Sequence, residues 1–248
     1  MKENNDIKII KKLDIFDYIY NIQARNTNQK SKIKMGKGEK NQRERKLPVK
    51  FMESVQLTPT CWDNLAYWAN LSKRAFWIID EIGYDDLDLM QFILLWNQED
   101  EAAGIEIEDR EPIKIFIFSQ GGDAEIGDSL FEIVKTSKTP VIGYNMGLVA
   151  SAAFDVYIAC HKRISMPGAK FLVHEGSMRI SGQASVVENF GDLSKKMKNR
   201  MIDRITSQTK ITKAMLGNKI KSDWWFLTDE AIKLGVAHEI AKDVTELF

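Results

Sequence analysis

Residues 113–122 read Ile-Lys-Ile-Phe-Ile-Phe-Ser-Gln-Gly-Gly, a β-rich run that ends at a pair of glycines. Directly after it, residues 123–137 carry apolar side chains at helical spacing, and residues 140–144 form a second strand-like run. Upstream, residues 74–79 are apolar and strand-like, whereas residues 86–97 again show helical spacing. This alternation of strands and helices predicts an α/β fold built from crossover units.

The C-terminal half continues the alternation. Residues 170–173 are strand-like, and residues 184–208 predict a long helix whose length indicates projection from the body of the domain. One apolar stripe runs along this helix, formed by Val187, Phe190, Leu193, Met197, Met201 and Ile205. A short helix that begins at Thr228 and is closed by Gly235 precedes a last strand at residues 236–240.

The composition fits one globular domain with an N-terminal extension. Of the 248 residues, 44% are hydrophobic, which supports a sizeable core, and 35 Lys and Arg balance 35 Asp and Glu. Residues 1–50 hold 14 Lys and Arg against 6 Asp and Glu, a net charge of +8, so the remainder carries −8. Such a tail could contact nucleic acid or acidic lipid, but we favour a solvated extension. We expect a basic flexible extension at 1–50 and one domain at 51–248.

Within the extension, residues 7–22 place Ile9, Leu13, Phe16 and Tyr20 at the spacing of a short amphipathic helix. This helix would be either a docking arm or a removable leader. Residues 26–50 lack periodic hydrophobic side chains and are typical of a flexible linker.

Several classes of protein are disfavoured. The two cysteines, Cys61 and Cys160, form no disulfide framework and no zinc pattern, and as buried thiols they fit a reducing cytoplasm. No apolar run has the length of a secretory signal or of a membrane span. The sequence contains no Gly-rich loop ending in Lys-Ser/Thr, so we expect no ATP hydrolysis by the chain itself. His174-Glu175 lacks a second histidine at zincin spacing, so we expect no metal site.

The segment at residues 147–153, Gly-Leu-Val-Ala-Ser-Ala-Ala, sets one serine among small residues, and His174 follows an apolar run shortly after it. Small neighbours allow close approach of a backbone, and a serine that opens a helix can expose its hydroxyl. A serine hydroxyl needs a base to act as a nucleophile, and a histidine can supply it. Ser151 and His174 are therefore candidate catalytic residues. His161 and His238 are weaker candidates for the base, because His161 lies in a polar turn and His238 lies near the C-terminus.

Together with their surroundings, these residues resemble the ClpP family, the proteolytic subunits of the Clp protease. Four landmarks carry the resemblance over residues 118–247. They are Ser119-Gln120-Gly121-Gly122, like the family's Ser-Pro-Gly-Gly; the serine segment 147–153; Met166-Pro167 followed by Phe171-Leu172-Val173-His174; and Gly182-Gln183-Ala184 at the start of the long helix, with Ser222-Asp223 before Trp224 to Ala231.

The resemblance implies a crotonase/ClpP-like α/β superfold and assigns roles to individual residues. Ser151 would be the nucleophile and His174 the general base, and Asp223 would be a buried carboxylate that fixes the tautomer of the histidine. The backbone amides of Gly122 and Ala152 would form the oxyanion hole. The implied activity is that of a serine endopeptidase working through an acyl-enzyme.

The resemblance also implies an assembly. It predicts self-association into stacked seven-membered rings in the cytoplasm, fed with polypeptide substrates by a separate ATPase. We expect no cofactor, no bound nucleic acid and no membrane span. Two alternatives remain open, namely a catalytically inactive scaffold or regulatory subunit, and an acyl-CoA enzyme of the same superfold that uses the two amides without a nucleophile.

The sequence also departs from the family pattern at three places. Gln120 stands for a proline, Glu175-Gly176 for Gln-Pro after the base, and Ala152-Ala153-Phe154 for Met-Gly-Ala. These departures mark a divergent ClpP-like protein, either of phage type or a specialised paralogue. They concern the substrate-binding surface and the ATPase partner more than the triad.

Overall fold

The computed structural model describes residue 67, residues 69–176 and residues 180–247. The chain divides into two units, Met1–Lys73 and Arg74–Phe248, and every strand among the described residues belongs to the second. The predicted extension at residues 1–50 and Cys61 lie outside the described residues. No helix in the described part of the chain combines the length and apolar character that a membrane span needs.

Three parallel strands form the centre of the second unit. Strands β1 (Ala75–Ile82), β2 (Ile113–Gly122) and β3 (Val141–Ala150) pair side by side, and helices α4 (Leu87–Ala102) and α5 (Ala124–Thr136) connect them. The predicted alternation of strands and helices is thus confirmed. In the middle of β2 the consecutive residues Ile115, Phe116 and Ile117 are all buried, as expected of a strand covered on both faces of a parallel sheet, whereas Phe118 near its end is exposed.

An aromatic row fixes the register of these strands. Trp77 pairs with Phe116 across β1 and β2, and Phe116 pairs with Tyr144 across β2 and β3. The rings stack with centroids 4.7 Å apart in both pairs. Since cross-strand aromatic pairs stabilise one register over its neighbours, this row aligns the ends of the three strands, where the candidate site lies.

Strand β3 forks, and its fork positions Ser151. Its first half pairs with β4 (Lys162–Ser165), whereas its second half pairs with β5 (Lys170–Val173). Asn145 sits between the two halves, where its Nδ2 donates to the Lys170 carbonyl and its Oδ1 accepts from the Gly147 amide. The buried Asn145 side chain therefore forms hydrogen bonds with two backbone groups at the point where β3 changes its partner strand.

The remaining elements complete one sheet and its helices. The order of the main sheet is β1-β2-β3-β4-β7, and β6 extends it beyond β5 as an antiparallel strand. The further elements are α6 (Ala152–Ala159), α7 (Ala184–Gln208), α8 (Lys213–Lys219), β6 (Trp224–Leu227), α9 (Thr228–Lys233), β7 (Glu239–Ile240) and four short 3-10 helices, Tyr84–Asp86, Ile107–Asp109, Ile220–Ser222 and Val244–Leu247.

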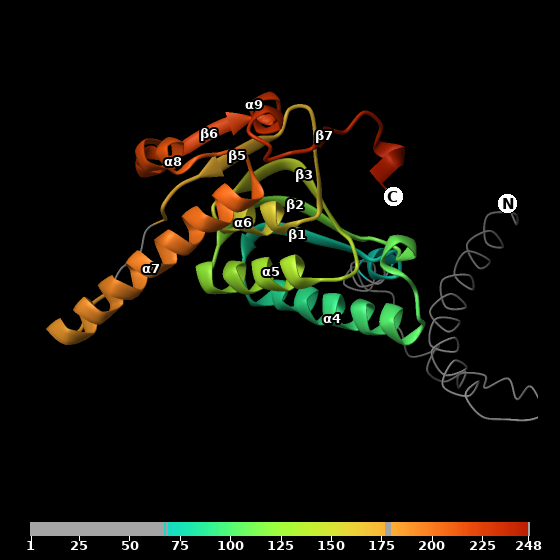
Figure 1. Ribbon diagram of the computed structural model, residues 1–248, viewed down its shortest axis with the longest axis horizontal. Coiled ribbons are helices and arrows are strands. Elements are labelled where there is room, and N and C mark those ends of the chain that lie inside the picture. Colours follow the sequence, from blue (N-terminus) through green and yellow to red (C-terminus); the bar gives the residue numbers. More distant parts are fainter. Residues whose placement is uncertain (1–66, 68, 177–179, 248) are drawn as a thin grey trace, which may run out of the picture. The chain divides into compact units, whose positions relative to one another are not determined.

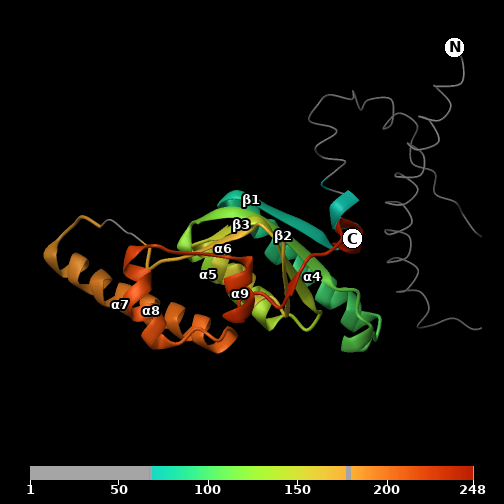
Figure 2. The same ribbon diagram turned by 90° about the horizontal axis from the view of Figure 1, so that it is seen from above.

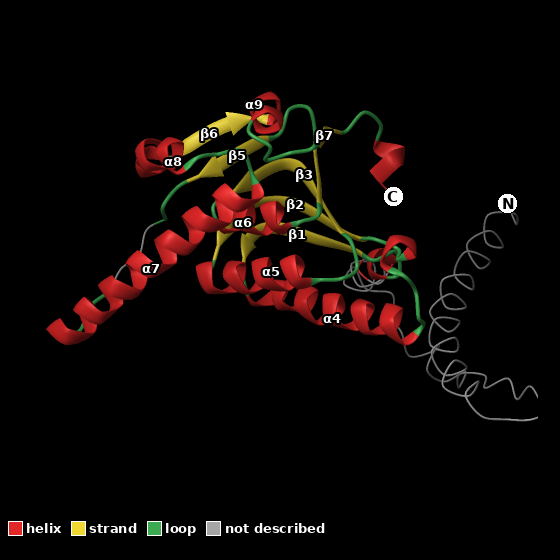
Figure 3. Cartoon of the chain, viewed as in Figure 1, coloured by secondary structure: helices red, strands yellow, loops and turns green. Residues whose placement is uncertain are grey.

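Helices α4 and α5 lie next to each other along one face of the strands (Figures 1 and 3). Helix α5 also packs on α6, which is almost entirely buried. The N-terminus of α5 is capped by Asp123, whose carboxylate accepts from the Glu125 and Ile126 amides at 2.8 and 3.0 Å. The cap starts the helix directly after the glycine pair of β2, so the glycines remain at a sharp turn.

The predicted long helix is confirmed with the same bounds, 184–208. It extends away from the strands in both views (Figures 1 and 2). Arg204 and Ile205, near its C-terminal end, are its buried residues, whereas Val186, Val187 and Leu193 near its start are exposed. Of the predicted apolar stripe, Ile205 alone is buried within a single chain, and the residues nearer the start of the helix are exposed or partly covered.

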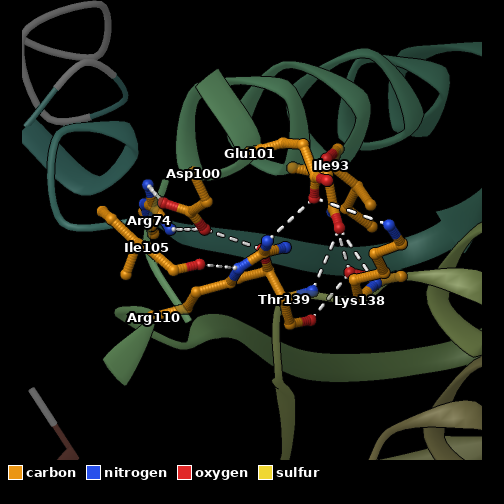
Figure 4. A network of polar contacts seen from close by, with 10 residues as sticks. Arg74, Ile93, Asp100, Glu101, Ile105, Arg110, Lys138 and Thr139 are labelled. Atoms are coloured by element: carbon orange, nitrogen blue, oxygen red, sulfur yellow. Dashed lines mark hydrogen bonds and ion pairs between the residues drawn. The ribbon is translucent and has the colours of Figure 1, made fainter. Parts of the chain in front are cut away.

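A buried polar network ties the end of α4 to the strands (Figure 4). The Arg74 guanidinium donates to both carboxylate oxygens of Asp100 at 2.7 and 2.8 Å, and the Thr139 hydroxyl donates to Asp100 at 2.7 Å. Burial acts to raise the pKa of Asp100, but the hydrogen bonds from Arg74 and Thr139 outweigh it and leave the pKa lowered. The ion pair joins the start of β1 to the helix that follows it.

Replacing Asp100 by alanine is expected to lower the free energy of unfolding by about 3 kcal/mol or more, because Arg74 would stay buried without a counter-charge. Chemical denaturation of the variant at neutral pH measures the loss. The exposed Glu108→Gln serves as control and should change stability by less than about 0.5 kcal/mol. Because the Asp100 pKa is lowered in the folded state, its contribution falls as the carboxylate is protonated at acid pH, so the difference between the two proteins should shrink there.

Candidate active site

Ser151 occupies a sharp turn between β3 and α6. Its backbone has φ 54° and ψ −126°, a left-handed conformation that is rare for a residue other than glycine. The Ser151 amide donates to the Leu172 carbonyl at 3.1 Å, which fastens the turn to β5. Strained backbone of this kind persists where the surrounding structure imposes it, and it often occurs at functional sites. The prediction that this serine opens a helix is confirmed.

The structure brings Ser151, His174 and Asp223 into one hydrogen-bonded row. The Nε2 atom of His174 lies 2.7 Å from the Ser151 Oγ, and its Nδ1 atom lies 3.1 Å from the Asp223 Oδ1. Three residues that are separated by up to 72 positions in the chain thus meet in the structure. The distances suit proton transfer from the serine hydroxyl to the imidazole.

Pairing of β5 with β6 positions two members of the row. The two strands are antiparallel, and Val173 at the end of β5 pairs with Trp224 at the start of β6. His174 and Asp223 are the residues next to this pair, so the register places them on adjacent backbones. Asp223 adopts φ 46°, a left-handed conformation that aspartate tolerates better than most residues.

The exposure of Asp223 differs from the expectation of a buried carboxylate. In the single chain its side chain is 61% exposed, and that of His174 is 28% exposed. The reason is that Asp223 lies between a short 3-10 helix and an edge strand, and nothing in the described part of the chain covers it. Water therefore competes for this hydrogen bond and screens it.

The glycine pair at the end of β2 approaches the serine turn closely. A Cβ atom on Gly121, which has φ +96°, would lie 2.6 Å from the Ser151 Cβ and 2.7 Å from the Ala150 carbonyl oxygen. Such contacts are sterically forbidden, so this position needs glycine. The Ser119 hydroxyl, to which the sequence analysis assigned no role, accepts from the Gly121 amide at 3.0 Å and donates to the Asp80 carbonyl, and so holds the turn.

Gly122, Ser151, Ala152 and His174 all line one cavity of about 250 Å³. Ala152 is the first residue of α6, so its amide has no acceptor within the helix and is available to a ligand. The two residues predicted to donate to an oxyanion therefore line the same cavity as Ser151. The cavity walls also include residues of α5 and α7 that the sequence reading did not assign to the site.

The other two described histidines have structural roles. His161 Nδ1 accepts from the Val141 amide at 3.0 Å, and His238 Nδ1 accepts from the Arg163 amide at 3.2 Å. Burial lowers the pKa of both side chains, which keeps them neutral and able to accept. Neither lines the cavity at Ser151.

Comparisons with known proteins find relatives by sequence and by fold. A family model described as Clp protease matches residues 102–244. An ATP-dependent Clp protease proteolytic subunit 2 from Treponema denticola is 33% identical over 135 residues, 54% of this chain and 68% of that protein. A subunit of the same description from Pseudomonas aeruginosa is 34% identical over 140 residues, 55% of this chain and 69% of that protein.

The fold is also shared with a solved structure. A mutant of ClpP1 from Listeria monocytogenes superposes with a TM-score of 0.61 at 26% sequence identity, over 74% of this chain and 99% of that one. The ClpP-like α/β fold predicted from the sequence is thereby confirmed.

Proposed function

The chain belongs to the Clp protease family, and on this basis we propose that it is a serine endopeptidase that hydrolyses peptide bonds through Ser151, His174 and Asp223. The observation that carries the proposal is the hydrogen bond of 2.7 Å between the Ser151 Oγ and the His174 Nε2. A hydroxyl with its base in place, at a cavity open to a substrate, is the minimum for acyl transfer.

In the first half of the reaction, the Ser151 Oγ attacks the carbonyl carbon of the scissile peptide bond while His174 Nε2 takes the hydroxyl proton. The resulting imidazolium then gives that proton to the nitrogen of the leaving amine, and the C–N bond breaks. Asp223 accepts the hydrogen bond from His174 Nδ1 and stabilises the positive charge on the ring. An acyl-enzyme remains on Ser151.

In the second half, His174 takes a proton from a water molecule that attacks the ester, and returns it to Oγ as the acid product leaves. Both halves pass through a tetrahedral intermediate with a negatively charged oxygen. The amides of Gly122 and Ala152 would donate to that oxygen. Loss of one such donor typically slows acyl transfer by about 100- to 1000-fold.

The proposal includes assembly into stacked seven-membered rings in the cytoplasm, fed by a separate ATPase. Helix α7 supports it, because its 25 residues span about 38 Å and leave apolar side chains at its projecting end uncovered in the single chain. Packing against other subunits would cover them. Enclosure would also keep folded proteins away from the serine, and the chain has no phosphate-binding loop with which to unfold them itself.

A fluorophosphonate probe tests chemistry and assembly together. The full chain is separated by size, and each fraction is assayed for probe attachment at Ser151 and for hydrolysis of an unfolded protein substrate. We expect both signals in the same large-assembly fractions. Ser129→Ala, which removes an exposed serine of α5, is the matched control and should label like the wild type.

Two results would contradict the proposal. Absence of label at Ser151 in assembled protein that hydrolyses no peptide would favour the non-catalytic scaffold. Binding of coenzyme A esters, with an activity that persists in Ser151→Ala, would favour the acyl-CoA enzyme.

A further inference from the structure

The cavity beside Ser151 contains a carboxylate that the proposed triad does not use. Asp155 lines it together with Ser151 and His174. Asp155 lies on α6, four residues after Ser151, which is the residue directly before the helix. It is the single charged residue of Ala152–Ala159, a helix whose other side chains are apolar or aromatic.

Two other acidic side chains line the cavity, and each has a cationic partner. Asp128 on α5 accepts from the Arg204 guanidinium at 2.5 Å, and Glu175 accepts from the Lys198 ammonium. Arg204 on α7 also donates to Glu132 at 2.8 Å, so its charge is shared between two carboxylates. Within the described residues, no hydrogen bond or ion pair reaches the Asp155 carboxylate.

The cavity lining also includes apolar side chains. Phe154 and Val173 come from α6 and β5, and Met201 and Ile205 come from the buried side of α7. Apolar walls can pack on the aliphatic part of a long side chain, while a carboxylate inside them holds its charged end. A partly desolvated carboxylate without a partner gains most from a ligand that brings a cation.

From this arrangement we propose that the cavity holds the side chain of the substrate residue next to the scissile bond, and that Asp155 selects lysine or arginine there. The inference rests on the proposed function, because it takes Ser151 as the atom that attacks that bond. Asp155 would be a specificity-determining residue, in contact with the substrate but not with the reacting atoms.

The charge state of Asp155 makes the selection dependent on pH. Burial raises its pKa to about 7, and the Asp128 charge adds to this effect, whereas the Arg204 charge opposes it. His174 and Glu175 face the same cavity from the end of β5. Above pH 7 the free enzyme holds Asp155 as a carboxylate, which attracts a basic side chain, and below pH 7 the protonated acid does so more weakly. The preference should therefore increase from pH 6 to pH 8.

The experiment uses the full, assembled protein and two peptides that differ in one residue before the scissile bond, lysine in one and leucine in the other. Both are present in the same reaction, so the ratio of their kcat/KM values cancels any change in His174. We expect the wild type to favour lysine by about tenfold or more at pH 8. Asp155→Asn should lower the ratio by about 10- to 100-fold, as loss of a charged hydrogen bond implies. Asp155→Glu should keep a preference for lysine.

Asp192→Asn, which removes an exposed carboxylate of α7, is the matched control and should keep the wild-type ratio. Labelling of Ser151 by a fluorophosphonate shows whether each variant still has its nucleophile in place. A ratio that is the same in wild type and Asp155→Asn, or that does not change between pH 6 and pH 8 in the wild type, overturns the inference. If hydrolysis still depends on Ser151 in that case, the inference about specificity is wrong but the proposed function stands.

Discussion

Replacement of Ser151 by alanine is expected to lower kcat/KM for peptide hydrolysis by about 10⁴- to 10⁶-fold. The change removes the Oγ atom that attacks the carbonyl carbon in the proposed mechanism, while His174 and the candidate oxyanion donors remain. Because the members of a triad act as a unit, loss of the nucleophile removes most of what the other two contribute. An assay of peptide hydrolysis by purified assemblies, with a dynamic range of at least about five orders of magnitude in rate, measures the effect.

The same variant should fold and assemble like the wild type. The Ser151 side chain makes one hydrogen bond in the described structure, to His174, and alanine meets the same left-handed backbone that serine does. The loss of one partly exposed hydrogen bond amounts to about 1 kcal/mol. Thermal unfolding and gel filtration check this point. Hydrolysis at the wild-type rate by Ser151→Ala would exclude Ser151 as the nucleophile.

Replacement of Asp223 by asparagine is expected to lower kcat by about 10³- to 10⁴-fold in the assembled protein. Asparagine can donate its amide proton to His174 Nδ1, which places the remaining ring proton on Nε2. A protonated Nε2 cannot accept the Ser151 proton across the 2.7 Å contact. Asparagine also tolerates the φ of 46° at this position, so the backbone should be unchanged.

The Asp223→Gly variant distinguishes the effect of the wrong His174 tautomer from the effect of losing the Asp223 charge. Glycine adopts the left-handed backbone at no steric cost and offers no amide to His174, so water can accept from Nδ1 at this exposed position. We expect it to retain more activity than Asp223→Asn. Asp229→Asn, an exposed residue at the start of α9, is the control and should match the wild type. Equal activity of Asp223→Asn and wild type would show that another group orients His174.

The elements with a clear hydrophobic period could be predicted from the sequence. Helix α7 has the predicted bounds, and its apolar residues recur over about five turns from Val187 to Ile205, while α4 and α5 follow the same rule within a few residues. The sequence predicts neither β4 nor β6, because β4 reads Lys-Arg-Ile-Ser with one apolar residue, and β6 is an aromatic run that leads directly into α9. Strand β3 is longer than predicted, since the fork at Asn145 interrupts the apolar run with a polar side chain that the fold buries.

For the site, the sequence by itself determined which chemical groups are present. A serine among small residues, a histidine after a strand and a glycine pair after another strand are local features, and a resemblance in order along the chain added Asp223. Their meeting was decided by tertiary structure, since the fork in β3 and the register of β5 on β6 set the distances among Ser151, His174 and Asp223.

Tertiary structure alone also decided the surroundings of these groups. Asp155 stands four residues after Ser151, a spacing visible in the sequence, but its pKa and its place in the cavity depend on α5 and α7, which come from distant parts of the chain. The physical reason is that burial and pairing of charges are properties of packed neighbours. A single sequence contains those residues but does not show which of them pack together.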